Sequence, residues 1–156
     1  MSWPSLVEWC YSSPLVSLLR DWKYGAPAVQ SVHLSGLTVL LGTVVILNFR
    51  LLGIGMRGLS LAVLARQLWR WAVGAMFLTI CSGVVIFILD PTRYLASGPF
   101  RLKMALLSLA IVYHFTVFRR VTRSEPGGRW RNIGVAFFSL TLWFGVGWAA
   151  RAIAFF

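Results

Sequence analysis

Long apolar stretches alternate with short basic segments along most of this chain. A helix needs about 20 apolar residues to cross the ~30 Å hydrocarbon core of a bilayer. Four stretches meet or approach that length, at residues 26–49, 71–89, 100–118 and 132–150. The pattern therefore predicts an all-α integral membrane protein, a four-helix bundle in which residues 1–156 form a single domain.

Turn and capping residues agree with these boundaries. Pro27 falls in the first turn of the first span, where its missing N–H costs little, and Pro99 opens the third span in the same way. Asp90 and Pro91 end the second span. Residues 60–70 have a helical pattern, so we expect them to lead into the second span as one continuous helix.

The N-terminal segment, about residues 5–22, is amphipathic and rich in Leu and Trp. Such a segment lies in the plane of the membrane interface with its apolar side toward the lipid. Ser13 and Pro14 are typical of a helix start, so we expect a second short helix to begin there. This interfacial segment completes the predicted fold.

Composition supports a membrane protein over a soluble basic one. The chain is 58% hydrophobic and only 12% charged, whereas soluble domains have about 25% charged residues. Its net charge of +11 would suggest nucleic-acid binding in a soluble protein. Here the basic residues form short clusters beside apolar spans, which is typical of membrane loops. We therefore expect membrane lipids as partners and no nucleic acid.

The distribution of basic residues predicts an orientation. The segments after the first and third spans hold nine of them: Arg50, Arg57, Arg66, Arg70, Arg119, Arg120, Arg123, Arg129 and Arg131. The opposite side holds six, offset by Glu8, Asp21 and Asp90. By the positive-inside rule, both termini face the periplasm of a bacterial cytoplasmic (inner) membrane.

His33 is the strongest candidate for a functional residue. It lies about two turns inside the first span, and an ionisable group within a span indicates function by default. Gln30, His33 and Gly36 form a stripe at helical spacing, and Gly36 would leave room for a flat ligand beside the imidazole. The alternative is a structural histidine that is hydrogen-bonded to Gln30 or to a neighbouring helix.

His114 lies five residues before Arg119, and we expect a structural histidine near the interface. At 1.5 Å per residue the two histidines differ in depth by roughly 18 Å, so they should not ligate one iron. Met104 matches the depth of His33 better, and His–Met ligation is known for haem iron. A haem bound by His33 and Met104 would have Lys103 or Arg101 near its propionates.

A charged cluster is expected near the periplasmic ends of the spans. Asp90 should pair there with Arg101 or Lys103, because an isolated buried charge is costly. Such a cluster beside His33 could also bind a quinone. No nucleophile–base pair, phosphate loop or metalloprotease motif is present, and few groups remain for acid–base chemistry.

Three runs of residues resemble a known family. Residues 33–53, 71–95 and 99–115 are similar to an uncharacterised family of bacterial four-helix membrane proteins, a domain of unknown function. The anchors of the resemblance are His33, Gly36, Gly42, Arg50, Gly83, Phe100 and Lys103. The layout is also similar, more distantly, to the haem-carrying, flavin-independent protoporphyrinogen oxidase and to copper-resistance protein D. In the first of these the functional positions would match His33, Arg50 and Lys103.

Two main functions follow from these observations. The first is a non-catalytic membrane subunit that anchors or scaffolds a larger redox or energy-converting assembly, with other membrane subunits as partners. The alternative is a small electron-transfer protein that binds haem b or quinone, centred on His33. Few polar residues line a path through the spans, so an enzyme or small-solute permease is less well supported.

Overall fold

The computed structural model describes residues 8, 11–55, 58–123 and 128–153, and this part of the chain is helical without strands. The long helices are α3 (Gly25–Leu51), α4 (Leu61–Leu89), α6 (Gly98–Tyr113) and α8 (Arg129–Ala152). The shorter ones are α2 (Pro14–Asp21), α5 (Pro91–Ala96), a π-helix η1 (His114–Phe118) and α7 (Arg119–Arg123). The predicted all-α fold is confirmed.

Four helical stretches of the described chain are long and apolar enough to cross a membrane. They are α3, α4, α8 and the continuous run Gly98–Arg123, which joins α6, η1 and α7. Helix α4 begins at Leu61, as the helical pattern of residues 60–70 predicts, and the Ser60 hydroxyl caps it by accepting from the Val63 N–H at 3.3 Å. The third span is longer than predicted, because η1 and α7 carry the helix past residue 118.

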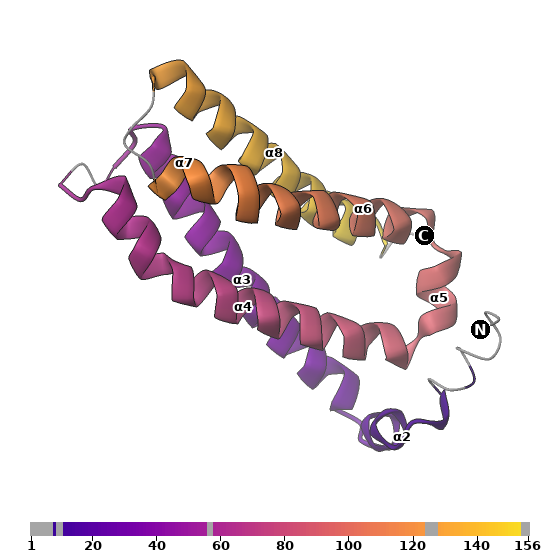
Figure 1. Cartoon of the computed structure of the whole chain (residues 1–156). Helices are drawn as coiled ribbons and strands as arrows, with labels where there is room; N and C mark the ends of the chain where they lie inside the picture. Colours follow the sequence, from indigo (N-terminus) through magenta and orange to yellow (C-terminus); the bar gives the residue numbers. More distant parts are fainter. Residues whose placement is uncertain (1–7, 9–10, 56–57, 124–127, 154–156) are drawn as a thin grey trace.

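The helices form two pairs. Helix α3 packs most extensively against α4, and α6 against α8, while α3 and α8 hold the two pairs together (Figure 1). Helices α4 and α6 scarcely touch along the described chain, and α5 connects their ends. Helix α2 and the C-terminal end of α8 lie at the end of the bundle that contains α5 (Figure 1).

The apolar core fills only part of the bundle. One cluster includes Leu40 and Val44 of α3 with Trp143 of α8, and a second includes Leu47 and Phe118. Every α3 residue in these clusters lies at or beyond Leu40. The core therefore joins the helix pairs from the middle of the bundle toward the α3–α4 connection. Neither cluster includes a residue of α5, and at that end Phe87, Tyr94 and Phe100 form a separate group of aromatic rings.

Helix α2 lies against this end of the bundle. It begins at Pro14, as predicted. Val16 is only 1% exposed, and the Arg20 guanidinium donates to the Leu89 carbonyl at 2.7 Å. On its outer side Leu18 is 67% exposed and Trp22, just past its end, is 53% exposed. Most of the predicted interfacial segment before residue 11 lies outside the described residues.

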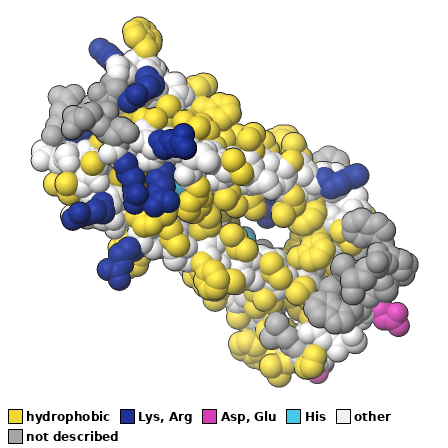
Figure 2. Space-filling view, viewed as in Figure 1, with side chains coloured by type: hydrophobic (Ala, Val, Ile, Leu, Met, Phe, Trp, Pro, Cys, Tyr) yellow, Lys and Arg dark blue, Asp and Glu magenta, His cyan; other side chains and the backbone are white. Residues whose placement is uncertain are grey.

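Basic side chains are more numerous at one end of the molecule. Figure 2 shows most of the visible Lys and Arg side chains gathered where α7, α8 and the α3–α4 connection meet, and fewer of them, with Asp or Glu side chains, at the opposite end. Asp90 does not pair with Arg101 or Lys103, contrary to expectation. Its carboxylate caps α5 instead, accepting from the Thr92 hydroxyl at 3.1 Å and the Arg93 N–H at 3.4 Å.

Candidate functional site

His33 is oriented by α4. Its Nδ1 lies 3.0 Å from the Ser82 Oγ, and the Ser82 hydroxyl donates to the Leu78 carbonyl at 2.6 Å. A hydroxyl has one proton, so Ser82 accepts from His33 when that proton is donated to the Leu78 carbonyl. This arrangement corresponds to the neutral imidazole with its proton on Nδ1. In that tautomer Nε2 carries a lone pair.

Two glycines bring α3 and α4 close together around this histidine. A Cβ on Gly36 would lie 2.7 Å from the Thr79 Oγ1, so only glycine fits there without displacing Thr79. A Cβ on Gly83 would lie 3.3 Å from the His33 Cε1. The expectation that Gly36 leaves room for a flat ligand is wrong, because Thr79 occupies that space. Gly83 is the glycine that faces the imidazole.

Thr79 adds further polar groups at the same level. Its backbone lies within hydrogen-bonding range of the His33 ring. Its Oγ1 is buried and has no hydrogen-bond partner within the described residues. An unsatisfied buried hydroxyl costs about 1–3 kcal/mol. Gln30 is exposed, and the hydrogen-bond partner of the His33 side chain, Ser82, comes from α4.

Lys103 faces the same region from α6. Its side chain is partly buried and lies within electrostatic range of His33. Arg101 is exposed, and Met104 is 43% exposed. Consecutive helical residues point about 100° apart, so Met104 and Lys103 do not share a face. Of the three predicted α6 residues, the structure brings Lys103 toward His33.

The space between the helix pairs gives access to these groups. The ribbons of α4 and α6 separate toward the α5 end (Figure 1), where Phe87 of α4 and Phe100 of α6 stack with ring centroids 5.7 Å apart. Figure 2 shows the surface hollowed in this region, with histidine and basic side-chain atoms visible inside. His33, Thr79 and Ser82 thus form a polar cluster beside an open cleft, and Lys103 of α6 lies within electrostatic range of His33.

His114 is buried inside the bundle. It is 3% exposed and stacks on Phe118 with ring centroids 5.1 Å apart. Its Nδ1 has no hydrogen-bond partner in the described part of the chain. The expected position near the membrane interface stays a prediction, because burial among helices does not give depth in the membrane.

The two histidines lie at different levels, as the spacing of the sequence predicts. His114 shares a small cavity with Leu47 of α3 and Ala72 of α4, whereas His33 contacts Ser82. Leu47 is separated from His33 by about 21 Å along α3, and Ala72 from Ser82 by about 15 Å along α4, at 1.5 Å per residue. One iron could not bind both rings.

Sequence reasoning missed the α4 side of the site. Thr79, Ser82 and Gly83 recur at spacings of three and four residues, which places them on one helix face. That stripe was a usable signal for the helix face that meets His33. The π-helix at His114 had no comparable signal.

Comparisons with known proteins give one match. Residues 7–156 match a family described as "Family of unknown function (DUF6644)". No curated protein and no solved structure matches the chain. The expected membership in a family of unknown function is confirmed, and nothing in the comparisons supports the more distant resemblance to the haem-related groups. The chain therefore belongs to the family of unknown function DUF6644, and the matched region contains all four membrane-length helices.

Proposed function

We propose that this protein is a small membrane electron-transfer protein that holds haem b in the cleft between α4 and α6. The observation that carries the proposal is the 3.0 Å hydrogen bond between the His33 Nδ1 and the Ser82 hydroxyl. Histidines that ligate metals almost always donate their other ring N–H to a fixed acceptor, which orients the ring. His33 has this arrangement, and its Nε2 lone pair would ligate the iron.

The basic residues of α6 are suited to binding a ligand that has an anionic edge. Haem propionates are carboxylates, and Lys103 is a partly buried cation within electrostatic range of His33. No ion pair to Lys103 occurs within the described residues. A propionate would supply the missing counter-charge, which a buried cation needs. Arg101 lies nearer the start of α6 and would meet a second propionate at the aqueous boundary.

The second iron ligand stays a prediction. Met104 is adjacent to Lys103 and would need α6 to rotate by about 100° to face His33. A haem with His33 as its single protein ligand requires no such rotation.

Quinone is the second ligand that the site could bind. A quinone carbonyl accepts hydrogen bonds, and the Lys103 ammonium is a donor. The hydroxyl of a reduced quinone could donate to the His33 Nε2. Solvent extraction of the purified protein, followed by chromatography, would distinguish the two ligands. Quinone at one per chain, lost in His33→Ala, would replace haem in the proposal.

Titration of haem into the purified protein tests the proposal. Wild-type protein in detergent should give a saturable Soret shift at one haem per chain. His33→Ala should lose it, because the iron ligand is removed. His114→Phe keeps a buried ring at the other level and is the matched control, which should bind haem like wild type. Equal binding by all three proteins would contradict the proposal.

A non-catalytic anchoring subunit is the other function that a specific observation favours. Helix α2 is anchored through Val16 and Arg20, yet Leu18 and Trp22 are exposed outside the bundle. Exposed apolar residues on an anchored helix are suited to docking another subunit of a redox assembly.

We also propose a bacterial cytoplasmic membrane location with both termini periplasmic. The larger number of basic residues at the end with the α3–α4 connection supports this orientation.

A further inference from the structure

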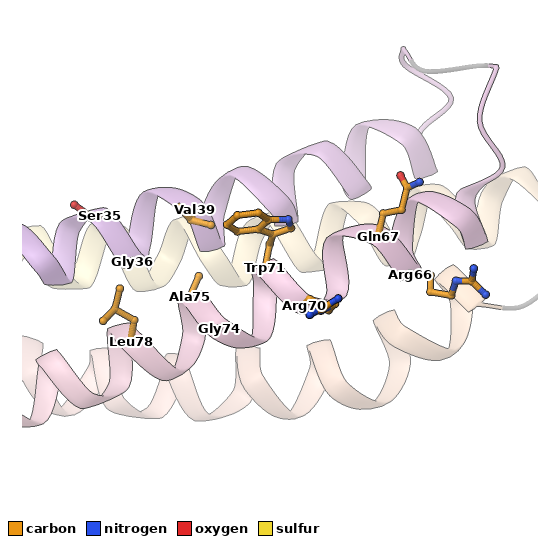
Figure 3. A pocket seen from close by; sticks show the side chains of 10 residues that line it. All are labelled: Ser35, Gly36, Val39, Arg66, Gln67, Arg70, Trp71, Gly74, Ala75 and Leu78. Atoms are coloured by element: carbon orange, nitrogen blue, oxygen red, sulfur yellow. The ribbon is translucent and has the colours of Figure 1, made fainter.

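A groove runs along the outer side of the contact between α3 and α4. Its volume is about 880 Å³. Its middle is lined by Gly36 and Val39 of α3 and by Gly74, Ala75 and Leu78 of α4 (Figure 3). A Cβ on Gly74 would meet no atom within 4 Å. The groove is therefore open at Gly74, where another residue would place a side chain. This part of the groove is apolar and open toward the lipid.

One end of the groove is cationic. Arg66, Gln67 and Arg70 line it from the first turns of α4. In Figure 3 the Trp71 indole lies across the gap between the helices, next to Val39, and the arginines follow further along α4. Arg66 and Arg70 are exposed and have no hydrogen-bonding, ionic or ring partner among the described residues. By contrast, Arg119 stacks on Trp69 at 4.1 Å.

The dimensions of the groove match one leaflet of a bilayer. Arg66 and Leu78 are twelve residues apart, which corresponds to about 18 Å along a helix. Half of the ~30 Å hydrocarbon core is about 15 Å. An amphiphile with its head at the arginines would therefore extend its tail to the middle of the membrane. The described acids, Glu8, Asp21 and Asp90, are remote from this end.

We propose that this groove is a binding site for one anionic phospholipid. The phosphate lies beside Arg66 and Arg70, and one acyl chain follows Gly74 toward Leu78. Charge complementarity selects the anionic headgroup, because two uncompensated guanidiniums face a groove that no described carboxylate neutralises. Trp71 lies at the level where indole rings favour the interface between headgroups and acyl chains.

Native mass spectrometry of the full chain tests the headgroup. The protein is released from detergent micelles that contain equal amounts of phosphatidylglycerol and phosphatidylcholine. Wild type should retain one phosphatidylglycerol. Arg66→Gln with Arg70→Gln should weaken retention roughly 30-fold, since each basic residue near an anionic surface contributes about a factor of five. Arg129→Gln with Arg131→Gln is the matched control, because these exposed arginines at the same end do not line the groove.

A second pair of variants tests the acyl chain. Gly74→Leu fills the groove, whereas Gly134→Leu adds the same side chain at another exposed helical glycine with open space around it. Only Gly74→Leu should lose the lipid. Excess inorganic phosphate should not displace the lipid, and displacement would show that the site binds free phosphate. Equal retention of the two lipids by wild type, or equal loss in both arginine pairs, would overturn the proposal.

Discussion

His33 depends on a serine from another helix for its orientation. The Ser82 Oγ lies 3.0 Å from the His33 Nδ1 and accepts from it when its own proton is donated to the Leu78 carbonyl. Ser82→Ala removes the acceptor and frees the ring to rotate, so haem affinity should fall about 10- to 100-fold, the usual effect of losing a partner behind a metal ligand. Haem titration measures this. Ser108→Ala is the control, because Ser108 only bonds the Met104 carbonyl of its own helix. Unchanged affinity in Ser82→Ala would show that Ser82 does not position the ligand.

Two glycines of α3 should respond oppositely to the same substitution. A Cβ on Gly36 would meet the Thr79 Oγ1 at 2.7 Å, whereas a Cβ on Gly42 would meet nothing within 4 Å. Gly36→Ala should therefore destabilise by about 1–3 kcal/mol through overpacking. Gly42→Ala should be neutral or stabilise by up to about 1 kcal/mol, since alanine favours helices. Unfolding in mixed micelles would measure both, and equal effects would refute the close α3–α4 packing.

The sequence predicted the ionisable members of the site better than their partners. His33 and Lys103 stand out because charged or titratable groups inside apolar spans are rare. The stripe of Thr79, Ser82 and Gly83 marks one face of α4, but periodicity within that helix does not show which face of α3 it meets. The burial of His114 was not predicted, because it depends on packing between helices.

The proposed docking of another subunit can be tested on helix α2. Leu18 and Trp22 are exposed while Val16 anchors the helix. Leu18→Ser with Trp22→Ser should reduce co-purification of partner subunits several-fold without unfolding α2. The control is Ile54→Ser with Leu59→Ser, exposed apolar residues at the opposite end of the bundle. Quantitative mass spectrometry of purified complexes measures the change. Identical partner recovery in both double variants would argue against docking through α2.

The long helices were predictable because a length of about 20 apolar residues is a strong signal. The start of α4 near residue 60 was predicted from the helical pattern of residues 60–70. In the structure the Ser60 hydroxyl caps this helix by accepting from the Val63 N–H. Helix α5 was not predicted, although Asp90 and Pro91 are a standard helix start. They were interpreted as the end of the preceding span, and in the structure they end α4 and begin α5.

The orientation of the whole molecule across the membrane stays a prediction. The arginine-rich end should face the cytoplasm and the end with α5 the periplasm. Single cysteines can be placed at Asp21 and Gly58, both exposed, in a chain whose own Cys10 and Cys81 are changed to alanine. An impermeant thiol reagent added to intact cells should label the Asp21→Cys protein only. Labelling of Gly58→Cys from outside would reverse the orientation.

The arrangement of the whole bundle makes the cleft possible. The apolar clusters join the helix pairs from Leu40 toward the α3–α4 connection. In the other direction, toward α5, the ribbons of the two pairs separate (Figure 1). Sequence periodicity predicted the four spans but not this divergence, because it arises from where the buried residues of different helices meet. His33 and Lys103 lie in the part that the core leaves open.

The most direct test of the account is the dithionite-reduced minus oxidised absorption spectrum of the protein purified from haem-replete cells. A haem held by His33 should give a Soret band and a b-type α-band at about one haem per chain by pyridine haemochrome assay. Both should be absent from His33→Ala and retained in His114→Phe. A wild-type spectrum without haem bands, or bands that persist in His33→Ala, would contradict the claim that His33 holds a haem.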